Sequence, residues 1–137
     1  MWWIYALLSA VFAALTAIFA KIGIKGVDSD LAMAVRTVVI LFVAWLIFFT
    51  RGNTKDITSL TKENIIFLVL SGIATGLSWV FYFKALSIGD VSKVAPIDKL
   101  SVAFAIILAG IFLKEAITLK TAIGAALIIG GSLVLIF

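Results

Sequence analysis

Five long apolar runs occupy most of the chain, and they limit its fold more than any other feature. Each run approaches or exceeds about 18 apolar-dominated residues, and roughly 20 helical residues cross the hydrocarbon core of a bilayer. The runs are continuously apolar, which excludes a closed barrel because barrel strands alternate. We therefore predict an all-α integral membrane protein, a single domain over residues 1–137 in the lipid bilayer. Its five transmembrane helices are expected at about 3–22, 31–49, 65–86, 91–113 and 119–137.

The composition narrows the possible functions. Hydrophobic residues make up 64% of the chain, and there is no cysteine and no histidine. These absences exclude disulfides, zinc sites built on those residues and histidine proton relays. The net charge of +4 is spread over several loops, so no basic face for nucleic acid forms. No catalytic set is found, and we expect no enzyme activity, no metal and no cofactor.

Short polar segments predict where the helices begin and turn. Asp30 is a candidate N-cap for the second helix, and Thr61 with Asn64 three residues later gives a weak capping signal for the third. Ser87 to Asp90 is expected to form the tight turn between the third and fourth helices. These connections leave no room for a soluble domain.

Ionisable residues inside the runs are the strongest sign of a functional site, because a charge at membrane depth costs several kcal/mol unless it is paired or wetted. Arg36 and Asp98 each lie roughly 10 Å inside their predicted helices. Lys99 follows Asp98, and Lys84 lies about one turn from the end of the third helix. Helix direction alternates, so all four groups fall in the same leaflet.

Two interpretations of these charges stay open. In the first, Arg36 and Asp98 form a structural ion pair while Lys84 and Lys99 extend to the interface. In the second, they form the mouth of a polar pocket for an anionic or zwitterionic solute. Pro96 removes a backbone donor just before Asp98, as at cavity-lining helix breaks. The predicted substrate pathway comprises Arg36, Ser78, Trp79, Tyr82, Lys84, Pro96, Asp98, Lys99 and Ser101.

Small residues recur at four-residue spacing in two helices, where they allow close helix contact in lipid. The third helix has Gly72 and Gly76, and the last has Ala122, Ala126 and Gly130. Packing within the chain is the simpler interpretation. A dimer seam is the alternative, and the last helix is our choice for it because it has no charge after Lys120.

The loop charges are nearly balanced across the membrane. The cationic side chains on the side of the amino terminus (side A) are Arg51, Lys55, Lys62, Lys114 and Lys120; those on the opposite side (side B) are Lys21, Lys25, Lys84 and Lys93, with Arg36 and Lys99 just inside. Orientation follows the difference in Lys and Arg between the two sides. This difference is close to zero, and two interpretations stay open: one loop dominates the orientation, or the chain inserts in both orientations.

Four short segments mark the ends and starts of the last three predicted helices: Tyr82 to Leu86 at a helix end, Val94 to Pro96 opening the next helix, Phe112 to Glu115 closing it, and the glycine-rich stretch Gly124 to Gly131. Together they resemble the EamA-type repeat of the drug/metabolite transporter superfamily. The run Asp98 to Ser101 resembles half-length, five-helix bacterial and archaeal members. Full-length members contain two such repeats in opposite orientations.

The resemblance implies a secondary transporter of a small metabolite in the cell inner membrane. A single five-helix repeat then needs a partner, and an antiparallel homodimer working by alternating access is the expected form. Small multidrug relatives carry an acid in the first helix, where this chain has Phe12 to Leu15 and no acid. Two alternatives stay open: a non-transporting membrane subunit or lipid-handling partner of a larger complex, and a heterodimer with a paralogous half.

Overall fold

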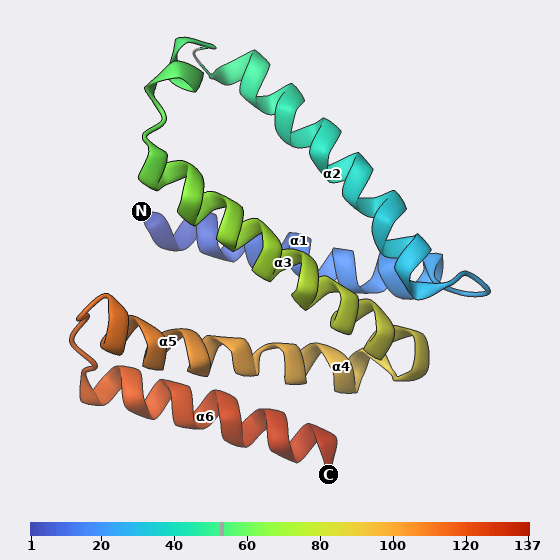
Figure 1. Cartoon of the computed structure of the whole chain (residues 1–137). Helices are drawn as coiled ribbons and strands as arrows, with labels where there is room; N and C mark the ends of the chain where they lie inside the picture. The colour runs from blue at the N-terminus through green and yellow to red at the C-terminus, as the bar shows by residue number, and fades with distance from the viewer. Residues whose placement is uncertain (53) are drawn as a thin grey trace. The chain divides into compact units, whose positions relative to one another are not determined.

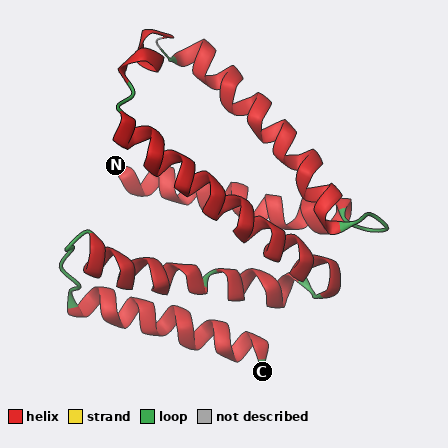
Figure 2. Cartoon of the chain, viewed as in Figure 1, coloured by secondary structure: helices red, strands yellow, loops and turns green. Residues whose placement is uncertain are grey.

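The computed structural model describes the backbone of residues 1–52 and 54–137, and all their side chains except those of residues 54–56. The described chain consists of helices and short connections (Figures 1 and 2). Five helical segments are long and apolar enough to cross a bilayer. The predicted all-α chain with five membrane spans is therefore confirmed. The elements are α1 (Trp2–Gly23), α2 (Ser29–Arg51), the 3₁₀ helix η1 (Thr54–Ser59), α3 (Lys62–Ile88), α4 (Val91–Asp98), α5 (Leu100–Phe112) and α6 (Leu119–Ile136).

The start of α2 differs from the prediction. Asp28, not Asp30, is the N-cap: its side chain accepts hydrogen bonds from the backbone N–H groups of Asp30 at 3.0 Å and Leu31 at 3.2 Å. Asp28 has extended backbone angles, which let its carboxylate reach over the first turn. Asp30 lies inside that turn, where its charge faces the positive end of the helix dipole.

Hydroxyl caps start the third and last spans. The backbone N–H of Asn64 donates to Thr61 Oγ1 at 3.2 Å, which confirms the capping signal read from the sequence. Thr118 caps α6 in the same way, accepting from the N–H of Thr121 at 3.2 Å. Side chains therefore satisfy part of the backbone at these helix ends. Lys55, one of the predicted loop charges, has its side chain outside the described part of the chain.

The turn after α3 is shorter than predicted. The helix continues through Ser87 to Ile88, so only Gly89 and Asp90 connect it to α4. Ser87 donates its hydroxyl to the carbonyl of Lys84 at 2.7 Å, a bond back along the helix that is compatible with its last turn. The carbonyl of Asp90 accepts from the N–H of Val94 at 2.9 Å and so opens α4.

The fourth span is interrupted at Lys99, inside the predicted helix 91–113 and three residues after Pro96. The backbone N–H of Lys99 is shared between the carbonyls of Ala95 at 3.3 Å and Pro96 at 3.1 Å. The N–H of Val102 then bonds to the carbonyl of Lys99 at 3.0 Å, three residues back. The chain tightens to 3₁₀ spacing for one turn after its single proline. Proline removes a donor from the helix, and this retightening accompanies that loss.

The chain divides into two compact units, one of residues Met1–Ile18 and Ile88–Phe137 and the other of Phe19–Ser87. In the first, α4 and α5 both pack against α6. In the second, the side-chain amine of Lys21 donates to the carbonyl of Leu86 at 2.6 Å, so the ends of α1 and α3 lie side by side.

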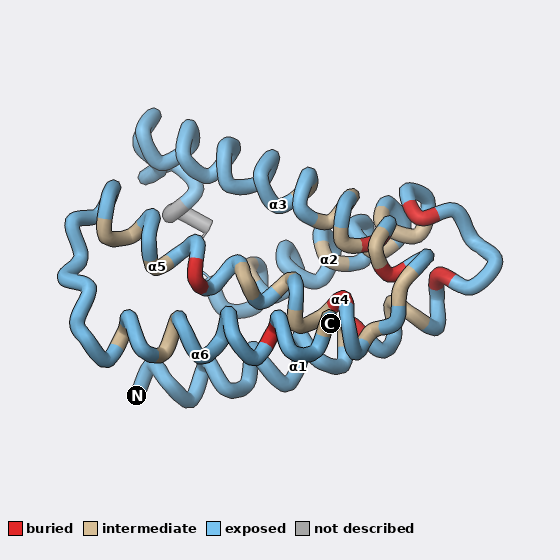
Figure 3. Tube along the Cα trace, turned by 90° about the horizontal axis from the view of Figure 1, so that it is seen from below, coloured by how far each residue is buried: buried red, intermediate tan, exposed pale blue. Residues whose placement is uncertain are grey.

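Few residues are buried (Figure 3), and at most 11% of any span's most apolar window is buried. The apolar helix surfaces are therefore available to lipid.

Candidate functional site

Arg36 lies inside the second span against an aromatic surface on α3. It is seven residues beyond Ser29, or roughly 10 Å along the helix axis. Its guanidinium carbon lies 4.5 Å from the ring centroid of Trp79 and 5.3 Å from that of Phe83. Trp79 and Phe83 are four residues apart, so both project from one face of α3. Arg36 is partly buried and Phe83 fully buried.

These ring contacts stabilise the charge of Arg36 without neutralising it. A desolvated cation over an aromatic face gains about 2 kcal/mol or more, less than the cost of holding arginine at membrane depth in many settings. Among the described residues of this unit, no carboxylate oxygen lies within 4.0 Å of the guanidinium. The Arg36–Asp98 ion pair considered from the sequence joins residues of different units and stays a prediction.

The other predicted pathway residues of α3 differ in how close they lie to this contact. The Tyr82 ring packs edge-on against the Phe83 ring, with centroids 6.4 Å apart and planes at 69°. Tyr82 is partly buried, whereas Ser78 and Lys84 are exposed. The structure therefore brings Arg36, Trp79 and Tyr82 together through Phe83, and it leaves Ser78 and Lys84 outside this aromatic contact.

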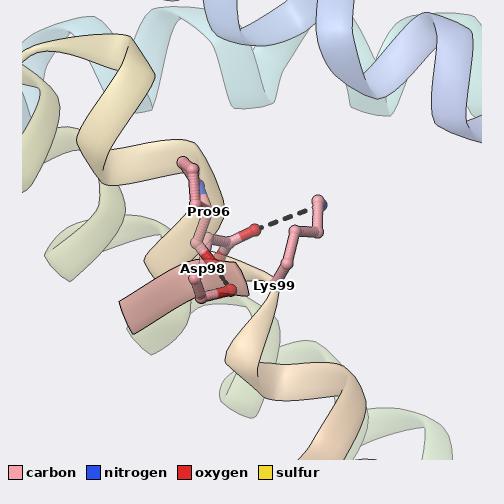
Figure 4. Close-up of polar contacts among 4 residues, drawn as sticks. Pro96, Asp98 and Lys99 are labelled. Carbon is pink, nitrogen blue, oxygen red and sulfur yellow. Dashed lines mark hydrogen bonds and ion pairs between the residues drawn. The ribbon is translucent and has the colours of Figure 1, made fainter. Parts of the chain in front are cut away.

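A second polar group lies at the interruption of the fourth span (Figure 4). The side-chain amine of Lys99 donates to the carboxylate of Asp98 at 3.3 Å, and the carboxylate side chain is 35% exposed. Asp98 and Lys99, whose charges are each costly to hold in lipid, thus form an ion pair between sequence neighbours. Ser101, at the start of α5, is exposed.

Ser132 holds the proline segment to the last helix. Its hydroxyl donates to the carbonyl of Pro96 at 3.0 Å, and Ser132 is only 6% exposed. In a bilayer, backbone carbonyls at a helix break need partners from within the protein. Ser132 supplies one from α6, so the break in the fourth span is fixed to a neighbouring helix.

The small-residue stripe of α6 does not face its neighbours in the unit. The partly or fully buried positions of α6 include Thr121, Ala125 and Ser132, and they follow helical spacing along one face. Ala122, Ala126 and Gly130 are exposed. On α3, a Cβ added at Gly72 or Gly76 would meet no described atom within 4 Å. Whether these stripes form a dimer seam stays a prediction.

Comparison with known proteins identifies the family. Residues 1–137 match the EamA-like transporter family. The chain belongs to this family. A Sinorhizobium sp. protein named "Uncharacterized transporter in cobO 3'region" is 46% identical over 134 residues, which cover 98% of this chain and 95% of that protein. No solved structure matches the chain significantly. The resemblance inferred from the sequence is thereby confirmed.

The EamA-type segments coincide with the cross-helix contacts described above. Tyr82 to Leu86 ends at the carbonyl that accepts from Lys21, and Val94 to Pro96 ends at the carbonyl that accepts from Ser132. In both places a side chain from another helix satisfies backbone near a helix end or break. These segments therefore hold the helices of this EamA-like chain together next to its intramembrane charges.

Sequence reasoning missed three of these contact residues. Phe83 was not singled out, although it lies four residues after Trp79 on the same face. Ser132 was overlooked in a glycine-rich helix, yet a lone hydroxyl in an apolar span signals a hydrogen bond within the protein. From the sequence, Lys21 is only one of the side-B loop charges. Each contact joins two helices, and helical spacing within one helix does not predict such pairs.

Proposed function

We propose that the chain is one half of a secondary transporter for a small metabolite, working by alternating access as an antiparallel homodimer in the bacterial inner membrane. The carrying observation is the match in length between this chain and a protein named as a transporter: the Sinorhizobium protein is covered over 95% of its length. That relative is thus close to this chain in length. A transporter of this family built from one repeat needs a second copy to complete the inverted pair.

An odd number of spans and balanced loop charges support the antiparallel arrangement. Five spans place the two ends of the described chain on opposite sides of the membrane. The cationic residues of sides A and B are nearly equal in number, so neither orientation is strongly favoured. The exposed stripe of Ala122, Ala126 and Gly130 on α6 is the proposed seam between copies.

The proposed pathway uses the two polar groups described above. Arg36 with Trp79 and Tyr82 forms one, and Asp98 with Lys99 forms the other at the break after Pro96. The other residues proposed for the pathway are Ser78, Lys84 and Ser101. Cations outnumber acids among these residues, which suits an anionic or zwitterionic solute.

The test is transport by the purified protein in liposomes. Proteoliposomes would be incubated with a mixture of small metabolites, and retained solutes would be identified by mass spectrometry against protein-free liposomes. We expect selective uptake that Arg36→Gln reduces and that Lys25→Gln, a change at an exposed loop cation, leaves intact. A folded dimer that takes up no solute would favour a non-transporting subunit. A chain that purifies only with a different partner would favour a heterodimer.

A further inference from the structure

The guanidinium of Arg36 lies against two aromatic rings, which leave its hydrogen-bond donors for a ligand. Arginine has a planar head with five N–H donors that point outward in the plane. The guanidinium carbon lies 4.5 Å from the ring centroid of Trp79 and 5.3 Å from that of Phe83, and these ring contacts hold the cation without a conventional hydrogen bond. Within the described residues of its unit, no hydrogen bond or ion pair takes up these donors.

Such donors at membrane depth favour one class of ligand. Two parallel N–H donors match the two oxygens of a carboxylate or phosphate, and this bidentate pairing is stronger than bonds to neutral acceptors. Arginine keeps its charge at any pH that a cell reaches, so the site stays cationic. Trp79 and Phe83 hold the guanidinium in place beforehand, which reduces the ordering needed when the ligand binds.

We propose that Arg36 binds the carboxylate or phosphate group of the transported solute through its guanidinium N–H donors, with Trp79 and Phe83 holding the guanidinium in place. This inference deepens the proposed transport function and rests on it. It assigns the anion to Arg36 and not to the lysines: Lys84 is exposed, and Lys99 is already paired with Asp98. The Tyr82 ring packs on Phe83 and extends the same aromatic surface.

A lipid headgroup carries the same phosphate chemistry, and the position of Arg36 distinguishes the two sources. The residue is two turns inside α2, roughly 10 Å from the start of the helix, whereas headgroups lie at the helix ends. We therefore assign the site to a soluble anion that enters from the aqueous side.

The experiment uses Trp79 as a reporter. The chain has four tryptophans, and replacing Trp2, Trp3 and Trp45 by phenylalanine leaves Trp79 alone against Arg36. The purified protein in phosphatidylcholine nanodiscs would be titrated with cyclohexanecarboxylate and methylphosphonate. Cyclohexanemethanol and cyclohexylammonium serve as neutral and cationic controls of similar shape. Trp79 emission and the thermal unfolding midpoint are read together, because bound ligand raises the midpoint by mass action.

We expect saturable changes with the two anions and none with the controls. Arg36→Lys keeps the charge but loses the planar edge, and we expect it to weaken anion binding about 10- to 100-fold, the range for a charge-assisted bond. Lys25→Gln is the matched control, since it removes an exposed side-B cation, and binding should stay unchanged. Equal binding by Arg36→Lys and the parent protein, or anion binding absent from both readouts, would overturn the proposal.

A second set of measurements distinguishes a lipid ligand from a soluble one, and anion binding from transport. Replacing part of the phosphatidylcholine by phosphatidylglycerol should leave the Trp79 titration unchanged; a Trp79 response to that lipid with none to the soluble anions would overturn the assignment to a solute. Selective uptake that is insensitive to Arg36→Lys would refute this inference and keep the proposed function. Anion binding without any uptake would refute transport and keep the site.

Discussion

Replacing Ser132 by alanine is expected to weaken the contact between α6 and the broken fourth span. The change removes one hydrogen bond, from Ser132 Oγ to the carbonyl of Pro96 at 3.0 Å. The carbonyl keeps a second donor, the backbone N–H of Lys99 at 3.1 Å, so it is not left wholly unsatisfied. Single hydrogen bonds between membrane helices contribute about 0.6 kcal/mol on average and about 1.7 kcal/mol at most. Because Ser132 is 6% exposed, we expect a loss of about 1 kcal/mol.

The assay is unfolding in mixed micelles at increasing mole fractions of sodium dodecyl sulfate, followed by circular dichroism. Ser132→Ala should shift the midpoint to a lower fraction of denaturing detergent, with Ser132→Cys between it and the parent, since a thiol is a weak donor. Ser9→Ala, at an exposed position of α1, is the matched control and should not shift the midpoint. A Ser132→Ala protein as stable as its parent would refute the role assigned to this bond.

Three further predictions concern other described contacts. Lys21→Met should cost about 1.5–3 kcal/mol in the same unfolding assay by removing the charged donor from the Leu86 carbonyl, with exposed Lys25→Met as control; equal midpoints would contradict it. Asp28→Ala should cost about 0.5–2 kcal/mol by removing the N-cap of α2, and more than Asp30→Ala; the reverse order would refute the cap assignment. Asp98 is an acid inside a predicted span and can bind and release a proton, so Asp98→Asn should abolish acceleration of uptake by a proton gradient; unchanged gradient-driven uptake would exclude Asp98 from coupling.

The sequence predicted the membrane spans because their cause is local. A run of about 20 apolar residues forms a helix in lipid whatever its neighbours are, since its backbone must be satisfied within the segment. The sequence determines the exact first and last residues of each helix less well. Asp28 and Asp30 are both suitable caps, and only the backbone angles of Asp28 distinguish them. The interruption at Lys99 lies three residues after the proline that indicated a break.

The candidate site was predicted only in part, because its contacts join different helices. Charge at membrane depth identified Arg36, Asp98 and Lys99 without their partners. Arg36 lies on Trp79 and Phe83, a contact that depends on how α2 packs against α3. Asp98 and Lys99 pair only in certain side-chain conformations, and the sequence does not determine which conformations they adopt.

The central claim is that two copies insert in opposite orientations, and labelling from one side of the membrane tests it most directly. The chain has no cysteine, so Val27→Cys in the side-B turn and Ala116→Cys in a side-A turn each introduce one charge-neutral, exposed target. Intact cells would be treated with a membrane-impermeant maleimide and compared with permeabilised cells. We predict that each variant is labelled from outside in about half of its molecules, as opposite insertion of equal numbers requires. Full labelling of one variant and none of the other would contradict the antiparallel homodimer.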